Sequence, residues 1–156
     1  RALPRLAGFL SGLTFEGRVE LTEAVRRLPA KGAGMTIILS DFLQDIFFEP
    51  KAEALGNMLR FLNYRKQNPV LLQVLAGEEL SVELTGTKNL IDMEENSALR
   101  LTLDAASIRV YQAALGEFLS SLRRMCAKAG AFYAVCSTET AIDQLIFEDL
   151  RKLYDI

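Results

Sequence analysis

Residues 34–42 read GMTIILSDF, an apolar run that begins after Gly34 and stops at Ser40 and Asp41. A short, continuous apolar run of this kind is typical of a parallel strand that is covered on both faces. In open α/β sheets, ligands bind just beyond the carboxyl ends of such strands. We therefore expect a buried strand that ends at a site, with Asp41 as the first candidate residue of that site.

Two more apolar runs predict parallel strands, at Val70–Leu75 and Ala131–Cys136. Helical spacing predicts helices over residues 3–13 and 20–28, from Pro50 to a turn at residues 68–69, from an Asp104 cap to Gly130, and after a cap at residue 137 or 138. A helix between two parallel strands is a βαβ crossover. This alternation predicts an α/β, Rossmann-like fold of three layers (αβα) with parallel central strands.

The middle of the chain differs from the rest. It holds short segments of mixed polarity at residues 80–84, 89–93 and 99–103, with turn residues between them. This pattern favours a small antiparallel β insertion at the margin of the sheet. The length of 156 residues, half of them hydrophobic, suits one domain over residues 1–156. Because the first residue is Arg1 rather than Met, we expect a fragment or processed piece of a longer chain.

Composition excludes several classes of function. A formal net charge of −2 with interspersed signs gives no basic stripe for nucleic acid or a membrane surface. The absence of histidine excludes Ser-His and Cys-His nucleophile pairs and His-containing zinc sites. Cys126 and Cys136 are expected to be small buried hydrophobes rather than a disulfide. No apolar run approaches the roughly 20 residues of a spanning helix, so we expect a cytoplasmic protein.

An ordered series of short segments carries a resemblance to a known family. The segments are Ile38–Leu43, Gln73–Leu75, Glu78–Leu80, Leu90–Glu94, Tyr111 and Cys136–Thr138. Together they resemble the C-terminal half of the bacterial domain of unknown function family fifty-eight, whose members are similar to von Willebrand factor A domains. The resemblance covers most of the chain from Gly17 onward. It implies a protein-interaction role, as an adaptor that works with a MoxR-type AAA+ ATPase and needs no catalytic residue.

The resemblance also implies a possible metal ligand. Von Willebrand A domains hold a divalent cation with an Asp-x-Ser-x-Ser loop, a Thr from a later loop and an Asp after the fourth strand, and Asp41 matches that last position. The Asp-x-Ser-x-Ser loop is absent here, and Val19 stands where the Thr would fall. Magnesium prefers near-octahedral oxygen ligands, so Asp41 with the Ser40 hydroxyl is an incomplete site.

Several interpretations of these residues stay open. Asp41 can be a metal ligand, a cap for backbone amides at a strand-to-loop turn, or, with Ser40, a partner contact. Glu78 and Glu79 follow the second strand and can recognise a basic surface or form a solvated charge pair. A different class of function is a magnesium-dependent hydrolase or phosphotransferase on a Rossmann-like sheet, with Asp41 as ligand or nucleophile. A purely structural domain is the third possibility.

The resemblance predicts one more property. In a von Willebrand A sheet, the strand that ends at Asp41 lies beside a first strand that this sequence does not contain. The segment from Met35 to Leu39 would then be an exposed, apolar sheet edge, which is the kind of edge that pairs with another chain. We therefore predict self-association through this strand, or a missing neighbour strand.

Overall fold

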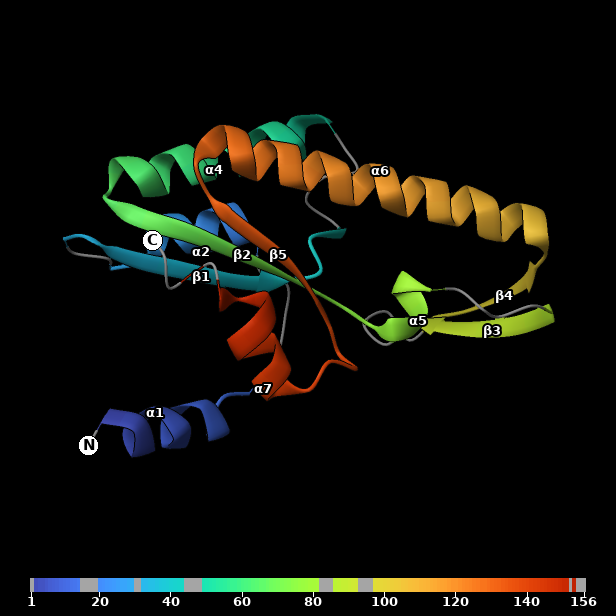
Figure 1. The fold of residues 1–156 in the computed structure, drawn as a ribbon, viewed down its shortest axis with the longest axis horizontal. Helices are drawn as coiled ribbons and strands as arrows, with labels where there is room; N and C mark the ends of the chain where they lie inside the picture. Colours follow the sequence, from blue (N-terminus) through green and yellow to red (C-terminus); the bar gives the residue numbers. More distant parts are fainter. Residues whose placement is uncertain are drawn as a thin grey trace.

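The computed structural model describes residues 2–14, 20–29, 32–43, 49–81, 86–92, 97–151 and 153, and the following account concerns these residues. Helices and strands alternate along most of the chain (Figure 1). In order, the elements are α1 (Ala2–Ser11), α2 (Leu21–Arg27), β1 (Gly34–Ser40), α4 (Glu49–Tyr64), β2 (Gln67–Leu75), α5 (Gly77–Leu80), β3 (Gly86–Asp92), β4 (Ser97–Leu103), α6 (Ala105–Ala129), β5 (Phe132–Ser137), α7 (Ile142–Gln144) and the π-helical turn η1 (Leu145–Asp149).

Three of the strands form a parallel sheet in the order β1-β2-β5. Ile37 of β1 is in register with Val70 of β2, which in turn is in register with Phe132 of β5. Helix α4 connects β1 to β2, and α6 precedes β5. The central strand is buried on both faces, which explains its nearly continuous apolar sequence. The predicted α/β fold with a parallel sheet and interleaved helices is confirmed.

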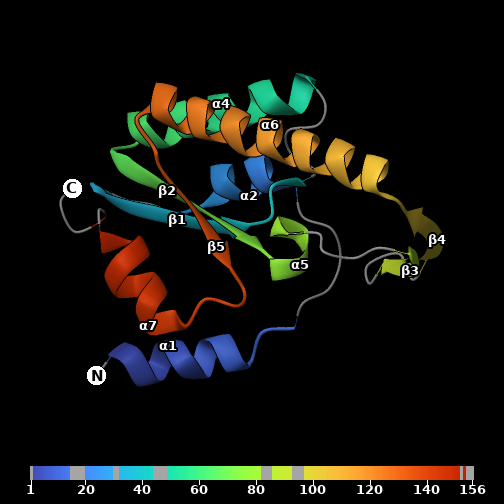
Figure 2. The same ribbon diagram turned by 45° about the vertical axis from the view of Figure 1, so that its right-hand side comes forward.

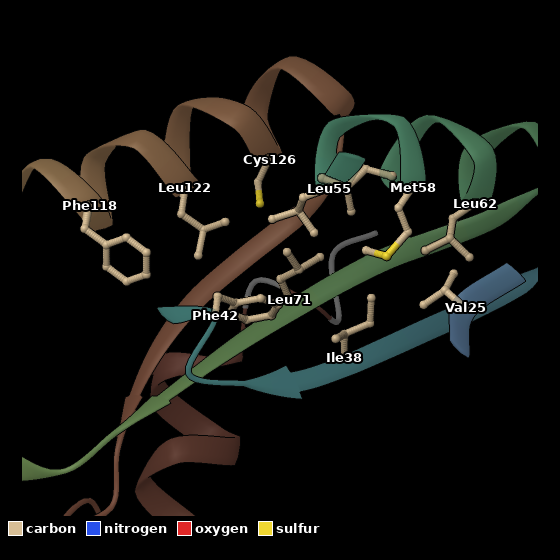
Figure 3. Close-up of a cluster of buried hydrophobic side chains, with 11 residues drawn as sticks. Val25, Ile38, Phe42, Leu55, Met58, Leu62, Leu71, Phe118, Leu122 and Cys126 are labelled. Carbon is tan, nitrogen blue, oxygen red and sulfur yellow. The ribbon is translucent and has the colours of Figure 1, made fainter. Parts of the chain in front are cut away.

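The larger hydrophobic core lies on the side of the sheet that α2, α4 and α6 cover (Figure 3). Side chains from all three helices meet Ile38 of β1 and Leu71 of β2 there. Phe42, from the turn after β1, enters the same cluster and is fully buried. The eleven buried members are Val25, Ile38, Phe42, Leu55, Met58, Leu59, Leu62, Leu71, Phe118, Leu122 and Cys126.

A smaller core lies on the opposite side of the sheet, where α7 is drawn in Figures 1 and 2. Its buried members are Val70 and Leu72 of β2 and Cys136 of β5. Leu145 and Leu150, at the two ends of the π-helical turn, pack against them. This cover reaches β2 and β5, whereas the side chains of β1 on the same face remain exposed. The expectation that β1 is covered on both faces is therefore wrong.

Helix α6 begins and ends where the sequence predicts. The Asp104 carboxylate accepts a hydrogen bond from the Ser107 backbone N–H, at 2.7 Å, as an N-cap does. Gly130 follows the helix in the left-handed conformation (φ 67°), which a glycine adopts without steric cost. Hydrogen bonds from the Ser107 backbone N–H and hydroxyl to the ionised carboxylate lower the pKa of Asp104 below its usual value.

Strands β3 and β4 form a separate antiparallel ribbon. Leu90 is in register with Leu99, and neither strand pairs with the parallel sheet. The ribbon lies beyond α5 and near the N-terminal end of α6 in both ribbon views (Figures 1 and 2). Two positions of the family resemblance, Glu94 and Val19, lie outside the described residues.

Strand β2 begins earlier than predicted. The expected turn at Asn68 and Pro69 is wrong, because both residues belong to β2 and pair with β1. Proline is unusual inside a sheet because it lacks a backbone donor. Here β5 pairs with β2 only from Val70 onward, so Pro69 lies where β2 has a neighbour strand on one side alone.

The segments at Leu80 and near the C-terminus also differ from prediction. Leu80 is the last residue of helix α5 and does not begin a strand. The last helix starts at Ile142 after an Ala141 cap, not after residue 137 or 138, and continues as a π-helical turn. The Ser137 hydroxyl instead accepts a hydrogen bond from the Glu139 N–H at 3.2 Å, and so stabilises the turn that precedes the helix.

Helix α1 carries the predicted apolar stripe, but the stripe is exposed. The large side chains of this stripe are between 39% and 63% accessible, and they are Leu6, Phe9 and Leu10 of α1 and Leu13 just after it. Figures 1 and 2 place α1 on the same side of the sheet as α7. Among the described helices, including α1, none combines the length and apolar content needed to cross a membrane.

Candidate functional site

The chain makes a tight turn directly after β1, at the residue that the sequence singled out. The Ser40 hydroxyl accepts a hydrogen bond from the Phe42 N–H at 3.0 Å, and the Asp41 carboxylate oxygen Oδ1 accepts one from the Leu43 N–H at 3.1 Å. Phe42 has a positive φ of 58°, which is uncommon for a residue with a side chain. Both polar side chains therefore hold the turn, while Asp41 stays exposed.

A buried glutamine fixes the position of this turn. Gln73 of β2 is fully buried, and its amide Nε2 donates to the Asp41 backbone carbonyl at 2.8 Å. Its Oε1 accepts a hydrogen bond from the Tyr133 hydroxyl of β5 at 2.5 Å. Burial raises the pKa of Tyr133 to about 12, so its hydroxyl keeps the proton that it donates. A continuous chain of hydrogen bonds thus links all three strands to the backbone of Asp41.

Gln73 and Tyr133 were not recognised from the sequence. A signal for Gln73 exists, because it is the only polar residue in the apolar run from Val70 to Leu75. A polar side chain in a buried strand must find hydrogen-bond partners. The sequence does not reveal which partners, since Asp41 and Tyr133 lie 32 and 60 positions away.

Glu78 and Glu79 lie at the same edge of the sheet, within the short helix α5. The Glu79 carboxylate accepts a hydrogen bond from the Ala76 N–H at 2.7 Å, and its backbone carbonyl accepts one from the Tyr111 hydroxyl at 3.0 Å. Partial burial, and then the nearby Glu79 charge, raise the pKa of Tyr111. Glu79 therefore stabilises the start of α5, whereas Glu78 is exposed to solvent.

The turns after β2 and β5 approach each other closely at this edge. The Glu139 carboxylate lies over Gly77, where an added Cβ would be only 2.2 Å from its carboxyl carbon. A side chain at this position would require the exposed Glu139 carboxylate to move aside. Among the described residues, Asp41, Glu78, Glu79 and Glu139 are not grouped closely enough to hold a common ion. The acidic side chains thus share one edge without forming a single cluster.

The side chains near Asp41 do not fit a complete metal site. In the part of the chain that the structure describes, no three acidic or thiol side chains are grouped so that they could hold an ion. The Ser40 hydroxyl and one Asp41 oxygen already accept backbone hydrogen bonds. Magnesium in proteins usually keeps several waters and is held by one or two carboxylates, and Asp41 is the one carboxylate of this turn among the described residues.

An apolar surface leads along β1 to the Asp41 turn. Met35, Ile37 and Leu39 point to the side of the sheet opposite the larger core, and they are 46%, 52% and 66% exposed. Ile38, which points to the other side, is buried. We call these three exposed residues the β1 stripe. It is the part of the parallel sheet's second face that α7 and η1 leave uncovered.

Comparison with protein-family models, curated proteins and solved structures found no match to the chain.

Proposed function

We propose that this chain is a protein-interaction domain that works as an adaptor, with its contact surface around the Asp41 turn. The observation that carries the proposal is the anchoring of this turn. Gln73 holds the Asp41 backbone from within the sheet, while the Asp41 side chain remains exposed at the end of the apolar β1 stripe. An exposed charge on a fixed backbone beside apolar surface is suited to recognising a protein partner.

The family resemblance extends this proposal to a fold and a partner. The fold would be the C-terminal part of a larger von Willebrand A-like domain of three αβα layers, with the β3–β4 ribbon as its small antiparallel insertion. The partner would be a MoxR-type AAA+ ATPase. Ser40, Asp41 and Glu78 would lie at the contact, whereas Glu79 would act by holding α5 in place.

The alternative is a magnesium-dependent hydrolase or phosphotransferase that uses Asp41. Such an enzyme needs further carboxylates, lysines or oxyanion donors within hydrogen-bond reach of Asp41. Among the described residues, the group bonded to its carboxylate is the Leu43 backbone N–H. The adaptor proposal requires no additional group, and it is therefore the one we prefer.

Binding of the purified chain to a purified MoxR-type AAA+ ATPase from the same organism tests the proposal. Asp41→Asn removes the charge but keeps the oxygen that accepts the Leu43 hydrogen bond. Glu53→Gln, at an exposed position on α4, is the matched control. We expect Asp41→Asn to weaken binding at least tenfold and Glu53→Gln to leave it unchanged.

Two outcomes would count against the adaptor role. Equal binding by both variants would place the contact elsewhere on the domain. Absence of binding, together with a heat of magnesium binding that is lost in Asp41→Asn, would favour the hydrolase alternative. Circular dichroism of each variant would establish that the fold is intact.

A further inference from the structure

Strand β1 has a hydrogen-bonding edge that no described strand occupies. The sheet order is β1-β2-β5, so β1 pairs with β2 on one side and has no partner strand on the other within the described residues. Its seven residues, Gly34–Ser40, include no charge and no proline. Charged side chains, prolines and bulges are the usual devices that prevent an edge strand from pairing with another chain. This edge lacks the first two.

The β1 stripe gives this edge an apolar face as well. Met35, Ile37 and Leu39 alternate with Thr36 and Ile38, so all three project to the same side. Each is nearly half exposed or more. When two strands pair edge to edge, such side chains contact their neighbours across the pair, which removes part of their surface from water.

The alternation makes β1 complementary to itself. In an antiparallel pair, residues directly opposite each other project to the same face. If two copies of β1 pair about a two-fold axis at Ile37, Ile37 lies opposite its own copy and Met35 lies opposite Leu39. The two exposed stripes then join into one, and Thr36 lies opposite Ile38 on the other face. A register shifted by one residue would place Ile37 opposite Ile38 or Thr36, which project to the other face. A regular antiparallel pair about a two-fold axis does not allow this shift.

We propose that a second copy of this chain is the partner of β1, paired antiparallel about a two-fold axis at Ile37. The two three-stranded sheets become one continuous sheet of six strands with β1 at its centre. The contact is isologous, because the same residues of both copies form it. This inference does not rest on the adaptor role, because it needs no other protein and uses the open edge of β1, which borders the Asp41 turn.

The expected dimer is weak. Pairing of one short strand from each copy buries far less than the roughly 1,200–2,000 Å² of a standard stable interface. We therefore expect a dissociation constant on the order of micromolar or weaker. The measurement must cover protein concentrations from about 1 μM to about 1 mM to include both species.

Sedimentation equilibrium of wild type, Ile37→Lys and Val110→Lys is the first test. Val110 is a similarly sized residue on α6 that is 70% exposed, so it controls for the added charge. We expect Ile37→Lys to weaken dimerisation at least tenfold and Val110→Lys to match wild type. A monomeric wild type at about 1 mM, or equal effects of the two variants, would overturn the proposal.

Disulfide trapping tests the register. In the proposed pairing, two Ile37→Cys residues face each other with Cβ atoms about 5 Å apart, within reach of a disulfide. Two Met35→Cys residues are separated by about four strand positions, or roughly 14 Å, and cannot be bridged. The native Cys126 and Cys136 are buried and do not compete. Faster dimer formation by Met35→Cys than by Ile37→Cys would refute this geometry.

Discussion

The two outer strands of the parallel sheet, β1 and β5, have similar apolar sequences but very different surroundings. β5 lies between two layers, because Tyr133 packs against the α6 side and Phe132 and Ala134 pack against the α7 side. β1 is covered on the α2 and α4 side alone, where Ile38 is buried. Its three residues on the other face remain exposed. Burial of an outer strand is thus decided by the helices that reach it and not by the strand's own hydrophobicity.

The largest expected effect comes from truncating a leucine on the covered strand β2, compared with the same truncation on the exposed strand β1. Leu39 of β1 and Leu72 of β2 are direct neighbours in register, yet Leu72 is 7% exposed and Leu39 is 66% exposed. We expect Leu72→Ala to lower the free energy of unfolding by about 2–5 kcal/mol, and Leu39→Ala to change it by about 0.5 kcal/mol or less.

Urea denaturation at about 0.1 μM protein, which is below the expected dissociation constant of the dimer, measures both values. The two substitutions remove the same atoms, so each serves as the control for the other. Similar losses of stability would mean that Leu39 is covered in solution and that β1 is not the exposed outer strand of this comparison.

The second prediction concerns the polar connection between the two outer strands. Gln73→Leu would leave the Asp41 carbonyl and the Tyr133 hydroxyl without their hydrogen-bond partner. Each unsatisfied group costs about 1–3 kcal/mol, so we expect destabilisation of at least about 2 kcal/mol. Hydrogen exchange of the Leu43 amide should also accelerate, because the turn loses its anchor.

Gln112→Leu, at an exposed position on α6, is the control for Gln73→Leu and should change stability little. Adding Tyr133→Phe to Gln73→Leu removes one of the two orphaned groups. The double variant should therefore lose less stability than the sum of the single changes. Additive losses would show that Gln73 does not couple β5 to the Asp41 turn.

The third and smallest effect is a pH dependence that is specific to β5. The pKa of Tyr133 is about 12 in the folded chain, above its ordinary value of 10.0. Between these values the folded state keeps a proton that the unfolded state releases. The contribution of Tyr133 to stability is thus complete below pH 10 and decreases as the pH rises toward 12.

A comparison of wild type with Tyr133→Phe isolates this contribution. Burial also raises the pKa of Cys126 to about 12, but this thiol is common to both proteins. Urea midpoints measured from pH 8 to above pH 10 should fall more steeply for wild type. Parallel curves would indicate that Tyr133 titrates normally and that the buried hydrogen bond to Gln73 does not persist.

The features that the sequence predicted correctly depend on residues that are close together along the chain. The apolar runs of β1, β2 and β5 and the caps of α6 at Asp104 and Gly130 are of this kind. It also placed Asp41 correctly at the carboxyl end of a strand. Contacts between distant residues were not predictable, including the Gln73 bond to Asp41 and the close approach of Glu139 to Gly77. The exposure of the α1 stripe was missed for the same reason, because periodicity shows that a face is apolar without showing what covers it.

The reactivity of the two buried cysteines can report how the two sides of the sheet open. Cys126 belongs to the eleven-residue core on one side of the sheet, and Cys136 belongs to the three-residue core on the other. A buried thiol reacts with an alkylating reagent only when its surroundings open, so the two labelling rates time the opening of the two layers separately. We expect Cys136 to be modified first in pulse-labelling mass spectrometry, because fewer buried side chains hold its layer closed. If Cys126 is modified at the same rate, the two layers come apart in a single event.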